Sequence, residues 1–175
     1  MSHSIVLLHK YKLMRKILVL LVSVFVAVNI FAQETKLYDP TADAEKDIAA
    51  VIKQAKEQHK YVLIMGGGNW CSWCTEFNRF SKADKQIDSV LNSAFIWYHL
   101  NISKENENKK VFASLGYPQR FGFPVFVVLN ENGERIHTQN SEYLEDGKKS
   151  YDKEKVQSFL EMWSPKALSP EMYGK

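Results

Sequence analysis

The spacing of apolar residues along the chain changes several times, and each change predicts a new element of secondary structure. Apolar residues that recur every three or four positions indicate amphipathic helices, whereas short continuous runs rich in β-branched and aromatic residues indicate buried strands. The helical spacing occurs over residues 43–60, 75–80, 84–92, 104–115 and 152–163. The strand-like runs occur over residues 61–65, 94–100, 121–129 and 134–139. The Asn132-Gly133 dipeptide, which is typical of hairpin turns, separates the last two strands.

This order of elements predicts an α/β fold with one central mixed sheet of four strands and helices on both faces. We expect the first two strands to be parallel, because a helix connects them, and the last two to be antiparallel, because a hairpin does. Residues 33–40, 140–151 and 164–175 show no periodicity, and we expect an extended lead-in, a polar loop and a loose tail there. Since the chain has no internal repeat or linker, residues 33–175 are expected to form a single domain.

Residues 1–32 have a different character, which is typical of a secretory signal peptide. Basic residues at positions 10, 12, 15 and 16 precede an apolar run over 17–28, and no acidic residue occurs before Glu34. We expect cleavage near Ala32 and hence an exported, periplasmic protein. The apolar run is shorter than the roughly 20 residues of a membrane span, although an uncleaved leader acting as a tether stays open. Met14 would itself make a normal start, so residues 1–13 are alternatively an over-extended gene start.

The leader also accounts for the apparent basicity of the chain. The 175 residues contain 23 basic and 20 acidic side chains, and four of the basic ones lie in the leader, which leaves 19 against 20. The lysine pairs at 109–110 and 148–149 are isolated, as is typical of solvated surface. We therefore expect no nucleic-acid partner for the domain, and we expect it to be a monomer.

The chemistry is concentrated in the segment that follows the first predicted strand. Cys71 and Cys74 are the only two cysteines, and they lie three positions apart between that strand and the next helix. A helix N-terminus presents unpaired N–H groups and the positive end of the helix dipole, which favour a thiolate over a thiol. We therefore predict that Cys71 is the attacking sulfur and that Cys74, one turn further along, resolves the mixed disulfide.

Other interpretations of this segment are weaker. Half a zinc site is conceivable, but outside the first 32 residues only His59, His99 and His137 occur, without paired spacing. An inert structural disulfide is the other alternative, but so small a loop would constrain the unfolded chain little. Residues 66–68 are three glycines, and no Lys-Ser/Thr follows them as in a phosphate-binding loop, so we interpret them as a turn that brings the backbone close to the thiols. We expect neither a metal nor a cofactor.

The residues around the cysteines resemble the thioredoxin superfamily. Residues 70–74 read Trp-Cys-Ser-Trp-Cys, which matches the family's Trp-Cys-x-x-Cys at a strand-to-helix junction, and Phe123-Pro124 before an apolar strand matches its cis-proline segment. The resemblance covers about residues 41–163 and implies a thioredoxin-like fold. It also implies that Pro124 is cis and packs beside the sulfurs, and that the Phe123 backbone is free to pair with a substrate strand. Trp70 and Trp73 are expected to complete the substrate-binding surface.

Two departures from the family pattern concern the active loop. Familiar thioredoxins carry a buried acid six residues before the first cysteine, where this chain has Met65, so Cys74 would need water or another group such as Glu76 to exchange its proton. The inner Ser72-Trp73 dipeptide differs from the Gly-Pro of thioredoxin. It is more similar to exported thioredoxin-like proteins of cell envelopes and to the soluble domains of thiol–disulfide interchange proteins.

The sequence thus predicts an envelope thiol–disulfide oxidoreductase that acts on protein disulfides or dithiols through Cys71 and Cys74. A membrane-bound or soluble redox partner would recycle the two cysteines. Two alternatives stay open at this point: a non-catalytic thioredoxin-like module that binds extended peptides at Phe123-Pro124, and an electron donor dedicated to one partner.

Overall fold

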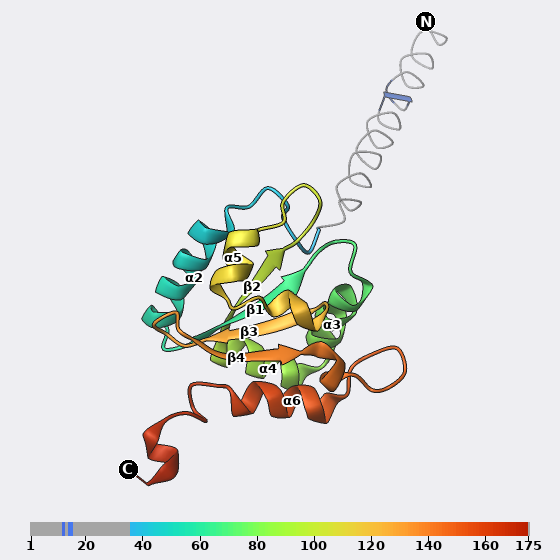
Figure 1. Ribbon diagram of the computed structural model, residues 1–175. Helices are drawn as coiled ribbons and strands as arrows, with labels where there is room; N and C mark the ends of the chain where they lie inside the picture. Colours follow the sequence, from blue (N-terminus) through green and yellow to red (C-terminus); the bar gives the residue numbers. More distant parts are fainter. Residues whose placement is uncertain (1–11, 13, 16–35, 175) are drawn as a thin grey trace, which may run out of the picture. The chain divides into compact units, whose positions relative to one another are not determined.

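A computed structural model describes residues 12, 14–15 and 36–174 of the chain (Figure 1). The chain divides into two compact units, residues 1–35 and 36–175, and the architecture described below is that of the second. The signal peptide expected over residues 1–32, together with the alternative start after residue 13, lies outside the described residues apart from those three isolated positions.

The domain is built on a single mixed sheet. Its strands are β1 (Tyr61–Gly67), β2 (Phe95–Asn101), β3 (Val125–Leu129) and β4 (Arg135–Asn140). They lie side by side in the order β2-β1-β3-β4. β1 and β2 are parallel, whereas β3 is antiparallel to both β1 and β4. The expected parallel first pair and antiparallel last pair are confirmed.

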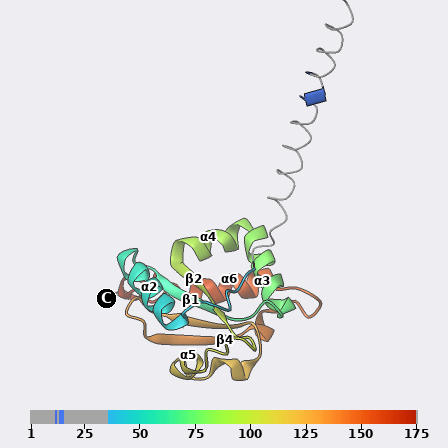
Figure 2. The same cartoon turned by 90° about the horizontal axis from the view of Figure 1, so that it is seen from above.

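Helices pack on both faces of this sheet. They are α2 (Ala44–Glu57), α3 (Ser72–Ala83), α4 (Lys85–Ala94), α5 (Lys109–Ser114) and α6 (Lys153–Met162). α2 and α5 share one buried cluster with the sheet, and α3, α4 and α6 share the other. Figure 2 shows α4 and α5 on opposite sides of the strands. The α/β class, with four mixed strands between two helical layers, is confirmed.

Alternation along β1 explains the two layers. Successive side chains of a strand point to opposite faces. Val62 and Ile64 therefore join the cluster of α2 and α5, while Leu63 and Met65 join that of the other three helices. All four are fully buried, as expected of a central strand covered on both faces.

Three expectations about element boundaries are wrong. The strand-like run over 121–129 forms a strand only from Val125, because Phe121 belongs to a 3-10 turn. The glycine run does not end β1 at residue 65, because Gly66 and Gly67 still pair with Leu100 and Asn101 of β2. The helix expected over 104–115 begins only at Lys109. Before it, the Asn108 amide donates a hydrogen bond to the Asn101 carbonyl at 2.9 Å. Asparagine side chains that bind nearby backbone in this way compete with helix formation.

Short 3-10 turns also occur, two of them in segments that showed no periodicity. They are Pro118–Phe121, Ser141–Leu144 and Pro170–Tyr173, of which the second lies in the expected polar loop and the third in the expected tail. Leu144 and Tyr151 are buried, so the loop over 140–151 contributes to the core despite its polar composition.

Within the described ranges, no helix has both the length and the apolar composition that crossing a membrane requires.

Candidate active site

The loop after β1 delivers Cys71 to the first turn of α3. Cys71 is the N-cap of α3, and its backbone N–H donates to the Gly68 carbonyl at 2.9 Å. The Cys71 sulfur accepts a hydrogen bond from the backbone N–H of Cys74 at 3.1 Å. The sulfur thus takes the place of the side-chain oxygen that usually caps a helix, and it faces the positive end of the helix dipole.

The two cysteine sulfurs are bonded to each other. The S–S distance is 2.03 Å and the Cα atoms are 5.3 Å apart. Cys71 is 5 % exposed, whereas Cys74 is 0 % exposed. A partner arriving from solvent therefore reaches the Cys71 sulfur first, and Cys74 lies on the protein side of the disulfide.

Neighbouring atoms leave no space for a side chain at two of the glycines before the cysteines. A Cβ atom on Gly67 would collide with the Cys74 sulfur and would lie 2.6 Å from the Tyr38 hydroxyl. A Cβ on Gly68 would collide with the Trp70 indole and would lie 2.7 Å from the Ile102 carbonyl. Gly67 confirms the expectation that glycine brings backbone close to the thiols, although Gly66 and Gly67 lie in a strand rather than in a turn.

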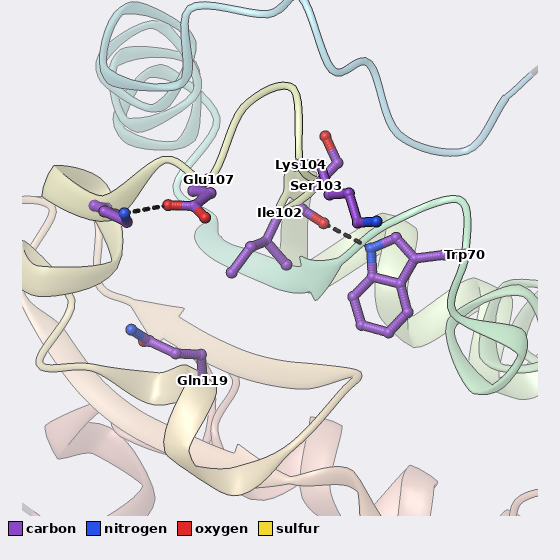
Figure 3. Close-up of a pocket in the computed structure, with 7 residues that line it drawn as sticks. Trp70, Ile102, Ser103, Lys104, Glu107 and Gln119 are labelled. Atoms are coloured by element: carbon purple, nitrogen blue, oxygen red, sulfur yellow. Dashed lines mark hydrogen bonds and ion pairs between the residues drawn. The ribbon is translucent and has the colours of Figure 1, made fainter.

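Trp70, the residue before Cys71, forms one wall of an open pocket. Its ring is 60 % exposed, and its indole N–H donates to the Ile102 carbonyl at 2.7 Å. The pocket has a volume of about 480 Å³ and is lined by Trp70, Ile102, Ser103, Lys104, Glu107, Lys109 and Gln119. Figure 3 shows Trp70 and Gln119 on opposite sides of it. Trp70 is therefore fixed in orientation and open to solvent, as a docking surface requires.

The Phe123-Pro124 segment lies next to this wall. The Phe123 ring meets the Trp70 ring edge-on at a centroid distance of 5.4 Å, and it packs against the cluster that contains both cysteines. The peptide bond between Phe123 and Pro124 is cis. Because Gly66 pairs with Val125, the register places Pro124 across from Gly67, the residue that touches Cys74. The structure thus brings Trp70 next to Phe123 and Phe123 against the cluster of the cysteine pair, whereas the packing of Pro124 beside the sulfurs stays a prediction.

Trp73 is turned toward the core. Its ring meets the Tyr151 ring edge-on at 5.5 Å, and its carbonyl accepts a hydrogen bond from the Tyr151 hydroxyl at 3.1 Å. Trp73 is half-buried rather than an exposed aromatic. A role for it in substrate binding stays a prediction.

Glu76 is engaged by other partners. Its carboxylate accepts hydrogen bonds from Arg79 at 2.6 and 2.8 Å and from the Ser150 hydroxyl at 2.5 Å. These hydrogen bonds, chiefly that from Arg79, lower the pKa of Glu76. A carboxylate that stays ionised is a poor proton donor at neutral pH, so Glu76 is not suited to exchange a proton with Cys74.

The structure also adds a residue that sequence reasoning missed. Tyr38 lies in the lead-in before α2 and is fully buried in the cluster that contains the cysteines. Asn69 holds it there: the Asn69 Oδ1 accepts from the Tyr38 N–H at 3.0 Å, and the Asn69 amide donates to the Tyr38 carbonyl at 2.8 Å. This contact spans 31 residues of sequence, and no periodicity predicts it. Its one signal in the sequence was Asn69, a polar residue next to the cysteine motif.

Metal-binding groups are scattered in this domain. Over residues 36–174 and the three isolated positions, no three His, Cys, Asp or Glu side chains are grouped so that they could hold a metal ion.

Known proteins share this fold. The sequence profile of the thioredoxin-like domain matches residues 48–145. The crystal structure of a disulphide isomerase from Xylella fastidiosa Temecula1 superposes with a TM-score of 0.64 at 23% sequence identity, covering 73% of this chain and 96% of that one. A structure described as a DsbH oxidoreductase superposes more loosely, with a TM-score of 0.44 at 16% identity over 65% of this chain and 81% of that one. None of the curated proteins matches the chain.

Proposed function

The chain belongs to the thioredoxin-like domain family, and from that premise we propose that it is a thiol–disulfide oxidoreductase acting on protein disulfides or dithiols. The observation that carries this proposal is the placement of Cys71. Its sulfur caps α3, accepts the Cys74 N–H and is the more exposed of the pair. Each of these features favours a reactive thiolate at Cys71 once the disulfide is reduced.

The reaction proceeds by two exchanges at the Cys71 sulfur. In the reducing direction, the Cys71 thiolate attacks one sulfur of a substrate disulfide, and the other substrate sulfur leaves as a thiolate. The Cys74 thiolate then attacks the Cys71 sulfur of the mixed disulfide and releases the second substrate thiolate. The substrate gains two electrons, and the protein ends as the Cys71–Cys74 disulfide that the structure contains. In the oxidising direction, a substrate thiolate attacks Cys71 of that disulfide first.

The surface around Cys71 suits an extended polypeptide. Trp70 directly precedes Cys71 and its ring packs against Phe123, so we take these two residues as the border of the substrate surface; the pocket lined by Trp70 could receive one substrate side chain. The pocket contains both Lys109 and Glu107, which form an ion pair, and apolar surface from Ile102. A polypeptide substrate would lie across this border with its disulfide against Cys71.

We propose that the protein acts in the cell envelope. The basic and apolar pattern of residues 1–32 supports export, because it has the n-region and h-region of a signal peptide. A catalytic cysteine pair outside the cytosol needs a redox partner that resets it, either in the membrane or in solution. Whether the protein reduces, oxidises or isomerises its substrates depends on the reduction potential of the pair relative to that partner.

Two cysteine variants test the activity. The wild-type protein should accelerate the reduction of insulin by dithiothreitol, and Cys71→Ala should lower the rate to that of dithiothreitol alone. Cys74→Ala should retain the first exchange and stop there, so it should collect mixed disulfides with envelope proteins that dithiothreitol releases. A Cys71→Ala protein with wild-type insulin reduction would contradict the proposal.

The same trap distinguishes the other functions. A peptide-binding module would yield no covalent species from Cys74→Ala while the wild-type protein still bound peptides. A donor dedicated to one partner would yield a single trapped species instead of several. Circular dichroism of each variant checks that the fold is retained.

A further inference from the structure

Tyr38 carries a polar group whose position needs an explanation. The side chain is fully buried, and its hydroxyl has no hydrogen-bond partner among the residues that the structure describes. Leaving a buried hydroxyl without a partner costs free energy, so such groups are rare and often serve a state of the protein other than the one observed.

The neighbour of this hydroxyl is the resolving cysteine. The Tyr38 hydroxyl and the Cys74 sulfur both occupy the space that a Cβ atom on Gly67 would need, the hydroxyl at 2.6 Å from that point. The two atoms therefore border the same space, which the missing side chain of Gly67 leaves open.

Tyr38 is fixed in this place by the redox loop itself. Both its backbone N–H and its carbonyl are bound by Asn69, which lies two residues before Cys71. The ring edge also contacts the His99 ring at a centroid distance of 5.6 Å. We therefore expect the hydroxyl to keep its position when the disulfide opens.

Other titratable groups near the pair are either paired or uncharged. The Tyr151 hydroxyl donates to the Trp73 carbonyl, and the Glu76 carboxylate binds Arg79 and Ser150. Burial lowers the pKa of His99 to about 4, so its ring is neutral and adds no charge at neutral pH. Burial raises the pKa of Tyr38, so its hydroxyl stays protonated wherever thiols titrate. Tyr38 is thus a donor that faces Cys74.

We propose that the Tyr38 hydroxyl donates a hydrogen bond to the Cys74 sulfur when the pair is reduced or in the mixed disulfide, and so stabilises the resolving thiolate. A thiolate is a far stronger acceptor than a disulfide sulfur, so the unpaired donor of the oxidised protein gains its partner on reduction. Cys74 releases its own proton to solvent, and Tyr38 keeps its proton throughout. The inference rests on the proposed function, because it assigns a role in the second exchange.

The equilibrium of the pair with glutathione tests this role. Tyr38→Phe removes only the hydroxyl, and it should shift the equilibrium about 5- to 10-fold toward the disulfide, because the reduced form loses a hydrogen bond. A tenfold shift corresponds to about 30 mV in reduction potential. Tyr98→Phe is the matched control, since its hydroxyl binds Asp47 and its ring belongs to the cluster on the opposite face of the sheet. That variant should leave the equilibrium unchanged.

A second measurement separates hydrogen bonding from packing. In a Cys71→Ser background, where Cys74 is the sole thiol, ultraviolet titration of the thiolate should give a pKa about 0.5 to 1 unit higher when Tyr38 is also Phe. If Tyr38→Phe fails to fold, the wild-type protein still gives an answer: the ζ-carbon resonance of Tyr38 should move on reduction in nuclear magnetic resonance spectra.

The outcomes are distinct from those of the activity test. An unchanged glutathione equilibrium and an unchanged Cys74 pKa in Tyr38→Phe would overturn the role of Tyr38 and leave insulin reduction by the wild-type protein untouched. A wild-type protein inert toward both glutathione and insulin would instead refute the proposed function.

Discussion

Gly67 is the residue at which strand geometry and cysteine chemistry meet. Its backbone pairs with Asn101 of β2, and its missing side chain leaves space for the Cys74 sulfur and the Tyr38 hydroxyl. We expect Gly67→Ala to destabilise the oxidised protein by about 1–3 kcal/mol, the usual cost of overpacking a core. The disulfide should suffer more than the dithiol, because a free Cys74 side chain can rotate away. The glutathione equilibrium should therefore move toward the dithiol.

Gly66→Ala is the matched control for Gly67→Ala. A Cβ there would meet the Val125 side chain at 3.1 Å and the Phe112 ring at 3.3 Å, and it would not reach the cysteines. It should lower the midpoint of urea unfolding while leaving the redox equilibrium in place. If both variants shifted that equilibrium equally, the contact between Gly67 and Cys74 would not be the cause.

The chemistry of the cysteines could be inferred from sequence, whereas the neighbour of Cys74 could not. The spacing of Cys71 and Cys74 between a strand and a helix is a local pattern, and local patterns define where a helix dipole points. Tyr38 reaches the pair through a contact with Asn69 over 31 residues of separation. A single polar residue in an aperiodic segment has no spacing from which such a contact can be predicted.

At the scale of elements, Asp84 links three helices. It ends α3 and begins α4, where its carboxylate accepts from the Gln86 N–H at 2.9 Å and the Ile87 N–H at 3.2 Å. The same carboxylate pairs with Lys153, the first residue of α6, at 2.8 Å. We expect Asp84→Ala to lower the melting temperature of the oxidised protein by roughly 3–6 °C, because α4 loses its N-cap.

Asp84→Asn separates the cap from the ion pair. Asparagine caps helices about as well as aspartate, while an exposed ion pair such as that with Lys153 contributes little. Thermal unfolding should therefore show a nearly wild-type melting temperature for Asp84→Asn. A loss as large as that of Asp84→Ala would mean that the charge rather than the cap holds these helices.

Helices and strands could be predicted where a pattern of apolar residues marked them in the sequence. The continuous apolar run of β1 predicted a buried strand, and the Asn132-Gly133 turn predicted the antiparallel pairing of β3 with β4. The glycines after Met65 were interpreted as a break, yet a glycine within a strand also marks close approach of another group, which is the case at Gly67. The start of α5 was placed too early, since its polar lead-in has the charge pattern of a helix but the side-chain hydrogen bonds of a loop.

On the scale of the whole molecule, the layer that holds the cysteines also buries a histidine. His99 lies on β2 with its ring against the Tyr38 and Trp97 rings, at centroid distances of 5.6 and 4.8 Å. Its Nε2 atom is buried and finds no hydrogen-bond partner over the described part of the chain. Burial is the main cause that lowers its pKa from 6.5 to about 4, and Lys82 adds to the effect. The folded state therefore favours the neutral ring.

This preference makes the stability of the fold depend on pH. Between pH 6.5 and about 4, the unfolded chain binds a proton at His99 that the folded protein does not, so the free energy of unfolding falls as the pH falls through this window. The loss should reach about 2–3 kcal/mol by pH 4. His99→Phe should flatten the decline in urea unfolding, while His59→Gln, at an exposed position in the turn after α2, should reproduce the wild-type slope. Burial also lowers the pKa of His137, so a smaller slope should persist. A full decline in His99→Phe would show that protonation of His99 does not drive it.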